Sequence, residues 1–111
     1  MAKFMYLYKG PATDMSGMSE EDVKIMMDQW GAWMGRVGKA LLDVGSPMAN
    51  SASIVDDGSA GVPALLSGYS IVEAADLEEA KALADGHPFL SAGTGEFSVD
   101  IFELFPAPFY I

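Results

Sequence analysis

Residues 69–89 read Tyr-Ser-Ile-Val-Glu-Ala-Ala-Asp-Leu-Glu-Glu-Ala-Lys-Ala-Leu-Ala-Asp-Gly-His-Pro-Phe, and this stretch decides the fold because a strand runs directly into a capped helix. The first part, residues 69–74, carries the aromatic and β-branched side chains that favour a strand. Asp76 is the expected N-cap of the helix, and Glu79 follows at the capping-box spacing. Gly86 supplies the usual helix stop, and Pro88 prevents the helix from continuing.

A strand and a longer helix precede this stretch. Residues 3–9 carry bulky apolar side chains on both faces of a predicted strand, and the glycine- and proline-containing residues 10–18 predict a loop. Ser19 is the expected N-cap of a helix whose apolar stripe recurs at spacings of three and four: Val23, Met26, Met27, Trp30, Met34 and Val37. Trp33 lies beside this stripe, where we expect it to face a cavity or a partner.

Three further segments complete the pattern. Residues 40–45 predict a second strand, residues 51–56 a short third one before a turn at 57–61, and residues 97–105 the last strand. Strand, helix, strand, short strand or turn, strand, helix, strand is the split βαβ plan. We therefore predict one domain over residues 1–111 of the α+β class, a ferredoxin-like protomer with an antiparallel sheet and two helices on one face.

Two helices cover only one side of such a sheet. The other side of residues 3–9 and of residues 97–105 is apolar enough in places to need cover as well. The simplest cover is a second copy of the chain, sheet against sheet. The expected partner is therefore the same chain in a symmetric homodimer.

Composition excludes several classes of protein. Sixteen acidic and six basic residues give a net charge of −10, and the bases are scattered singly, so we expect no nucleic-acid partner. The absence of cysteine excludes disulfides and thiolate metal sites. The chain has no run of about 18 apolar residues and its first residues lack a signal-peptide pattern, so we expect no membrane association and a cytoplasmic location.

Several segments together resemble the YCII-related (DGPF-type) domain proteins. They are Lys3-Phe-Met-Tyr-Leu-Tyr8, Trp30-x-x-Trp33 with Leu42-x-x-Gly45, Gly68-Tyr-Ser-Ile-Val-Glu-Ala-Ala-Asp76, and His87-Pro-Phe with Gly93. The resemblance implies a ferredoxin-like protomer assembled into a dimeric α+β barrel, mostly in bacteria, with a generally unassigned function. The same barrel is shared by muconolactone isomerases, and a chloromuconolactone dehalogenase looks similar in sequence to YCII-related proteins.

The chain departs from the family pattern at its proposed active site. Some members carry a histidine in the first helix that has been proposed to pair with an aspartate, whereas this helix has Met26, Met27 and Trp30. The family's aspartate before Pro-Phe is His87 here, and Asp57-Gly58 is not followed by Pro-Phe. The proposed pair therefore does not transfer to this chain.

The candidate site residues follow from their side-chain chemistry. His87 is the catalytic candidate, because only histidine has an unperturbed pKa near neutrality; the alternative is a helix C-terminal histidine near the last carbonyls. The ligand-binding candidates are three strand tyrosines, two loop residues and one tryptophan: Tyr6, Tyr8, Tyr69, Asp14, Ser46 and Trp33. Each also has an ordinary packing or turn-forming role.

Two functions from different classes remain open. The first is a homodimeric small-molecule-binding or interaction module, in which His87 points to solvent or caps its helix. The second is an isomerase- or lyase-type enzyme acting on a small cyclic or aromatic acid, in which His87 faces a cavity and shuttles a proton. No metal site and no cofactor are implied, since the acidic pair Asp56-Asp57 is typical of a turn and no phosphate-binding glycine loop is present.

Overall fold

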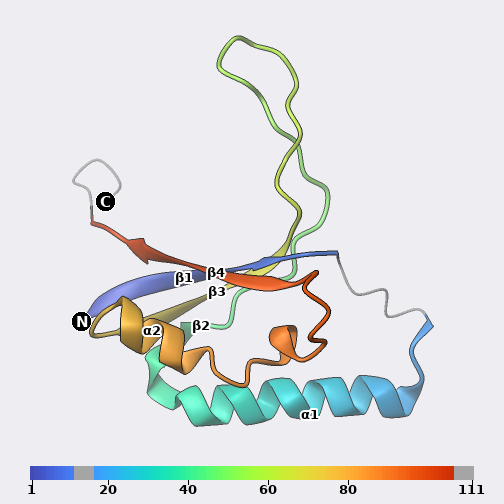
Figure 1. The fold of residues 1–111 in the computed structure, drawn as a ribbon, viewed down its shortest axis with the longest axis vertical. Helices are drawn as coiled ribbons and strands as arrows, with labels where there is room; N and C mark the ends of the chain where they lie inside the picture. The colour runs from blue at the N-terminus through green and yellow to red at the C-terminus, as the bar shows by residue number, and fades with distance from the viewer. Residues whose placement is uncertain (12–16, 107–111) are drawn as a thin grey trace.

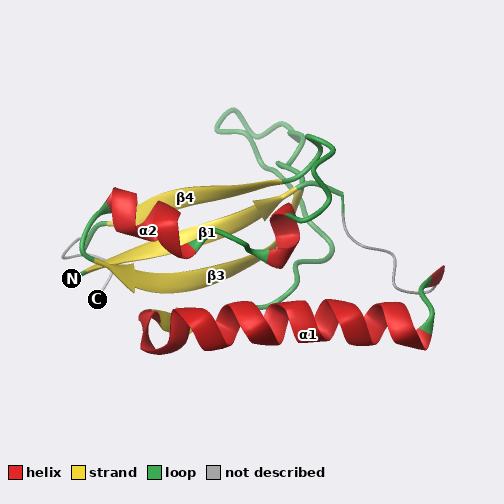
Figure 2. Cartoon of the chain, turned by 60° about the horizontal axis from the view of Figure 1, so that its bottom comes forward, coloured by secondary structure: helices red, strands yellow, loops and turns green. Residues whose placement is uncertain are grey.

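The computed structural model describes residues 1–11 and 17–106. Its four strands form one antiparallel sheet in the order β2-β3-β1-β4, and both helices lie on the same side of it (Figures 1 and 2). This is the predicted ferredoxin-like α+β fold. The elements are β1 (Ala2–Lys9), α1 (Glu20–Val37), the 3₁₀ turn η2 (Gly38–Ala40), β2 (Leu41–Asp43), β3 (Leu66–Ala74), α2 (Leu77–Leu83), the 3₁₀ turn η3 (Pro88–Leu90) and β4 (Ser98–Leu104).

The core lies between the sheet and the helices. β1 is central, so Tyr6 pairs with Ser70 of β3 on one side and with Ile101 of β4 on the other. We call the side toward the helices the inner face and the opposite side the outer face. Because strand side chains alternate, the inner face of β1 carries Phe4, Tyr6 and Tyr8, all of them buried.

The long helix α1 begins and faces the sheet largely as its sequence predicts. Ser19 Oγ accepts a hydrogen bond from the Asp22 N–H at 3.1 Å, which confirms the N-cap. The expected position of Trp33 is wrong: only 2% of it is exposed, whereas Met27 is 65% exposed. Compared with the predicted orientation, the helix is rotated so that the Trp33 indole is buried in place of the smaller Met27 side chain. The Trp33 Nε1–H donates to the Leu83 carbonyl at 2.9 Å, so the buried polar group of the indole has a partner.

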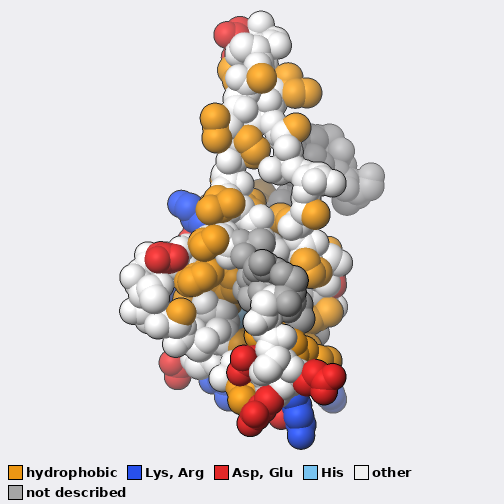
Figure 3. Space-filling view, turned by 90° about the vertical axis from the view of Figure 1, so that its right-hand side faces the viewer, with side chains coloured by type: hydrophobic (Ala, Val, Ile, Leu, Met, Phe, Trp, Pro, Cys, Tyr) orange, Lys and Arg blue, Asp and Glu red, His pale blue; other side chains and the backbone are white. Residues whose placement is uncertain are grey.

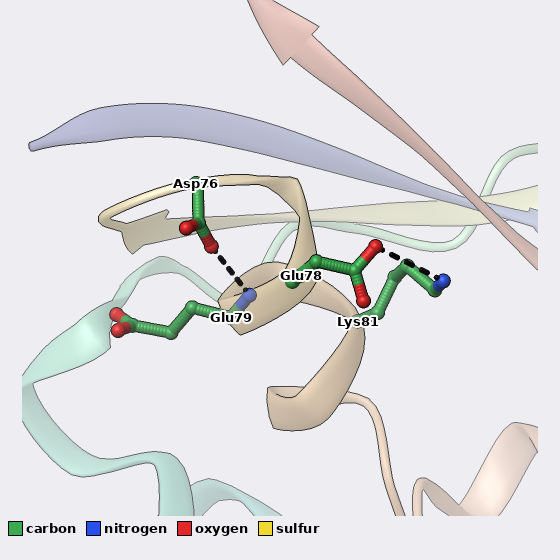
Figure 4. A network of polar contacts seen from close by, with 4 residues as sticks. All are labelled: Asp76, Glu78, Glu79 and Lys81. Atoms are coloured by element: carbon green, nitrogen blue, oxygen red, sulfur yellow. Dashed lines mark hydrogen bonds and ion pairs between the residues drawn. The ribbon is translucent and has the colours of Figure 1, made fainter.

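The short helix α2 has the predicted capping box. Asp76 accepts a hydrogen bond from the Glu79 N–H at 2.8 Å (Figure 4). The Glu79 carboxylate accepts one from the Ala75 N–H at 3.2 Å. Ala80 is buried against the sheet, but Leu77, which the stripe places on the same face, is 47% exposed. The small alanine allows close helix–sheet packing.

The connection between β2 and β3 differs from the prediction. The strand expected at residues 40–45 is shortened to β2 by the turn η2, and residues 51–56 form no strand. They make one isolated bridge, between Ile54 and Ala60. Residues 44–65, which we call the arm, instead rise from the sheet on the side away from the helices (Figure 1).

Candidate functional site

His87 lies between α2 and η3 and is buried, with 1% of it exposed. Its Nδ1 accepts a hydrogen bond from the Phe89 N–H at 3.0 Å and thereby caps η3. The ring is enclosed by aromatic rings, with centroid distances of 4.3 Å to Trp33, 4.8 Å to Trp30 and 5.0 Å to Tyr8. The imidazole is therefore a buried polar group in an aromatic core.

A chain of hydrogen bonds runs from His87 across the sheet. His87 Nε2 lies 3.0 Å from Tyr8 Oη, the Tyr8 hydroxyl donates to Ser70 Oγ at 2.6 Å, and the Ser70 hydroxyl donates to the Val44 carbonyl at 2.7 Å. The two end groups determine which atom donates in each of these hydrogen bonds, because the Phe89 N–H only donates and the Val44 carbonyl only accepts. Nδ1 of the imidazole must then be unprotonated, and Nε2–H must donate to Tyr8.

The surroundings keep both ring systems neutral near neutral pH. Burial, assisted by the charge of Arg36, lowers the pKa of His87 to about 4. Burial raises the pKa of Tyr8 to about 12, although the hydrogen bond with Ser70 acts in the opposite direction. Neither group has a pKa near neutrality, where an efficient general acid or base operates.

A cavity of about 360 Å³ adjoins this chain of hydrogen bonds. It lies between the start of β3, the base of the arm, α1 and η3, and its size falls in the usual range for small-molecule sites. Its lining is aromatic, aliphatic or neutral polar, without a charged side chain. The lining residues are Tyr8, Trp30, Val44, Gly45, Ser46, Pro47, Met48, Ser67, Gly68, Tyr69 and Phe89.

The structure brings together some of the predicted site residues. Tyr8, Ser46 and Tyr69 line the cavity. Tyr6 and Trp33 lie outside it in the core, where the Tyr6 hydroxyl donates to the Ala80 carbonyl. Asp14 lies outside the described residues.

The position of His87 matches neither sequence expectation in full. It does not line the cavity, but lies one hydrogen bond behind Tyr8. It does not point to solvent or contact the last carbonyls of α2 either, since its side chain caps the turn that follows. Pro88 begins that turn, which explains why the ring is directed toward the Phe89 N–H.

Residues 1–11 and 17–106 contain neither a metal-binding cluster of side chains nor a membrane-spanning helix. No three His, Cys, Asp or Glu side chains in this part of the chain gather as a metal site would require. Neither helix in the same residues is long and apolar enough to span a bilayer.

Comparison with known proteins identifies the family. The family model of the YCII-related domain matches residues 6–104. The chain belongs to the YCII-related domain family. Among curated protein sequences, none matches this YCII-related chain significantly.

A solved structure found by comparison shares the fold of this YCII-related domain over almost its whole length. It is 5-chloro-2-hydroxyhydroquinone dehydrochlorinase from Burkholderia phenoliruptrix, in complex with 2,5-dihydroxybenzoquinone, with 18% identity and a TM-score of 0.50. The alignment covers 95% of each chain. At this identity the likeness shows the fold alone.

Sequence reasoning missed two residues of this YCII-related site, Phe89 and Ser70. Phe89 is a cavity wall, as is Trp30, for which the apolar stripe favours a core position. Ser70 was passed over, although a hydroxyl at a buried position of an apolar strand was a usable signal, because such a group needs a partner. Nothing in the sequence indicated that this partner would be the Val44 carbonyl.

Proposed function

We propose that this YCII-related protein is a small-molecule-binding module whose cavity takes a small, neutral aromatic compound. The observation that carries the proposal is the uncharged cavity beside the chain of hydrogen bonds from His87 to Val44. Trp30, Phe89 and Tyr8 supply aromatic surface to the cavity. Ser46 and Tyr69 also line it, and each carries a hydroxyl, a group of the kind that orients ligands.

The electrostatics favour a neutral ligand over the small organic acid expected from the sequence. No lysine or arginine lines the cavity, so a buried carboxylate would lack a countercharge there. The net charge of −10 also opposes the approach of anions. A phenol or another neutral ring compound avoids both costs.

The dehydrochlorinase of similar fold acts on a substituted hydroquinone and was solved with a dihydroxybenzoquinone. Both are compounds with a single six-membered ring, the size class that suits a cavity of about 360 Å³. This likeness supports the ligand's size. It specifies neither a reaction nor a substrate for this chain.

The isomerase or lyase alternative stays a prediction, and the arrangement of His87 speaks against its mechanism. A proton shuttle needs a free lone pair, but Nδ1 accepts from the Phe89 N–H and Nε2–H donates to Tyr8. If Nδ1 were protonated, its N–H and the Phe89 N–H would be two donors facing each other. This agrees with the lowered pKa of the ring. We therefore assign His87 to holding Tyr8 in place.

Binding of matched neutral and anionic ring compounds tests the proposal. We expect catechol, hydroquinone or phenol to raise the melting temperature saturably, whereas benzoate has no effect at the same concentration. A ligand at a hundred times its Kd adds about 2.7 kcal/mol to the free energy of unfolding. Phe89→Ala removes one aromatic wall and should weaken binding at least tenfold.

Phe105→Ala is the matched control, because Phe105 is 81% exposed and lies outside the cavity. Its ligand affinity should equal that of the wild type. Stronger binding of benzoate than of phenol, or equal losses in the two variants, would refute the assignment of this cavity. Turnover of a bound compound that disappears in His87→Gln would instead favour the enzyme.

A further inference from the structure

The cavity lies at the base of the arm, and charge selects little among the neutral compounds that it can hold. Its lining contains no charged side chain. Figure 3 shows hydrophobic side chains along the arm, whereas many of the charged ones in that view gather at the opposite end of the molecule. Selection among neutral ligands must then come from shape and from hydrogen bonds.

The chain of hydrogen bonds meets the cavity at three residues. Phe89, Tyr8 and Val44 line the cavity, whereas His87 and Ser70 do not. The Phe89 N–H donates to His87, and His87 Nε2–H donates to Tyr8. The Tyr8 hydroxyl donates to Ser70, and the Ser70 hydroxyl donates to the Val44 carbonyl. Each polar hydrogen of the chain is thus used inside it, and toward the cavity the chain can only accept.

Tyr8 is the member of this chain that combines a polar side chain with a place in the cavity wall. Its hydroxyl oxygen accepts from His87 and its proton goes to Ser70, which leaves a lone pair for a ligand. Burial raises the pKa of Tyr8 to about 12, so the hydroxyl keeps its proton at neutral pH. The direction of these hydrogen bonds is therefore the same throughout the neutral range.

Neighbouring donors at the base of the arm are committed as well. The Gly45 N–H donates to the Asp43 carboxylate at 2.8 Å, and the Met48 N–H donates to the Ser67 carbonyl at 3.0 Å. The Ser67 hydroxyl donates to the Tyr8 carbonyl at 3.2 Å. A ligand that only accepts hydrogen bonds finds no partner among these groups.

We propose that Tyr8 determines the specificity of the cavity: a ligand hydroxyl donates to its oxygen, so phenols bind in preference to ethers and ketones of similar size. The inference rests on the proposed function and narrows its ligand from neutral aromatic compounds to those that donate a hydrogen bond. An ether or a ketone has no hydrogen to donate, and it would leave the Tyr8 lone pair unpaired in a buried site.

Calorimetric titration with phenol, toluene and anisole at pH 7 measures the preference. Transfer out of water alone favours toluene, because phenol gives up hydrogen bonds to water. We expect the wild type to bind phenol at least tenfold more tightly than toluene or anisole.

Tyr8→Phe keeps the aromatic wall and should abolish the preference for phenol. Tyr6→Phe is the matched control, because it removes a buried hydroxyl from the same strand that donates to the Ala80 carbonyl and does not line the cavity. This control should keep the wild-type ratio of the affinities for phenol and toluene. Far-UV circular dichroism establishes that each variant is folded.

Ser70→Ala tests the direction of the hydrogen bonds without altering the cavity wall, because Ser70 is fully buried and does not line the cavity. The substitution removes the acceptor of the Tyr8 proton, so this proton becomes available to a ligand. The ratio of the affinities for phenol and acetophenone, a ketone, should therefore fall at least tenfold. A merely structural role of Ser70 would weaken the binding of both compounds equally.

Three results would overturn the inference while the small-molecule site itself stands. They are equal or tighter binding of toluene and anisole by the wild type, an unchanged preference in folded Tyr8→Phe, and an unchanged phenol-to-acetophenone ratio in Ser70→Ala. Failure of every neutral ring compound to bind the wild type would instead refute the proposed function and, with it, this choice of ligand.

Discussion

At the scale of single residues, the imidazole of His87 is a fixed hydrogen-bond donor. One nitrogen accepts from the backbone of η3 and the other donates to Tyr8, so the ring joins the turn after α2 to the central strand. Among the described residues, no buried side-chain nitrogen or oxygen lacks a partner. A satisfied buried network makes the core specific, and the loss of one member leaves its neighbours unpaired.

Acid should therefore destabilise the protein through His87. Its pKa falls from 6.5 in the unfolded chain to about 4 in the fold, so below pH 6.5 the unfolded state binds a proton that the folded state does not. Stability is lost as the pH falls from 6.5 to 4, by about 3 kcal/mol from this group. Urea unfolding at a series of pH values measures the change.

The variant His87→Gln isolates this contribution, because an amide keeps a donor for Tyr8 and does not titrate. It should be less stable than the wild type at pH 7, and the difference should shrink by about 3 kcal/mol at pH 4. A constant difference across this range would mean that the pKa of His87 is the same in the folded and the unfolded protein. Titration of the carboxylates changes the free energy of unfolding of the wild type and of the variant equally, so it cancels in the difference between them.

At the scale of elements, two glycines have opposite roles. Gly45, at the junction of β2 and the arm, has φ +79°, and a Cβ there would lie 1.7 Å from the Tyr69 carbonyl oxygen. Gly31 lies within α1, and a Cβ there would meet nothing within 4 Å. The first glycine is required by close backbone contact, whereas the second only weakens its helix.

Alanine at each position tests this difference by chemical denaturation. Gly45→Ala should lower the free energy of unfolding by at least about 2 kcal/mol, since backbone must move at a left-handed position. Gly31→Ala should raise it by about 1 kcal/mol through helix propensity. Equal effects of the two substitutions would contradict the close approach of Gly45 to β3.

The glycines of α1 do not mediate close packing on the sheet. A Cβ added at Gly31 or at Gly35 would meet nothing within 4 Å. Burial in this helix is concentrated at Trp33 and Val37. The packing of α1 therefore depends on a few large side chains, and its glycines are open to replacement.

At the scale of the whole molecule, the uncovered outer face and the arm connect stability to concentration. If a second copy covers them, unfolding also dissociates the dimer, and a tenfold rise in concentration stabilises the dimer by about 1.4 kcal/mol relative to two unfolded chains. Calorimetry at several concentrations should show a rising melting temperature. A melting temperature independent of concentration would indicate that the folded protein is a monomer.

The cavity belongs to this scale as well, because no single element forms it. β3, the base of the arm, α1 and η3 each supply part of its wall. Val44 both lines the cavity and accepts the last hydrogen bond of the chain that begins at His87. The position of the arm's base is thus tied to the core by a contact across the sheet.

The sequence by itself determined the elements and their order. Capping residues Ser19 and Asp76, the alternation along β1 and the turn residues act within a few positions of the chain, so local physical chemistry is enough to predict the α+β fold. The prediction failed where the outcome depends on distant contacts. Trp33 is buried because Leu83 offers a carbonyl, and residues 51–56 form no strand because they lie out on the arm, away from the sheet.

The candidate site was decided only by the tertiary structure. Sequence chemistry selected His87, Tyr8, Ser46 and Tyr69, but not their arrangement, and it placed Tyr6 in the same set although its hydroxyl serves the core. The tautomer of His87 follows from two backbone groups, the Phe89 N–H and the Val44 carbonyl, and apart from the missing N–H of proline every residue type carries such groups. Hydrogen-bond direction and burial arise only when segments far apart in the chain meet, so no local pattern encodes them.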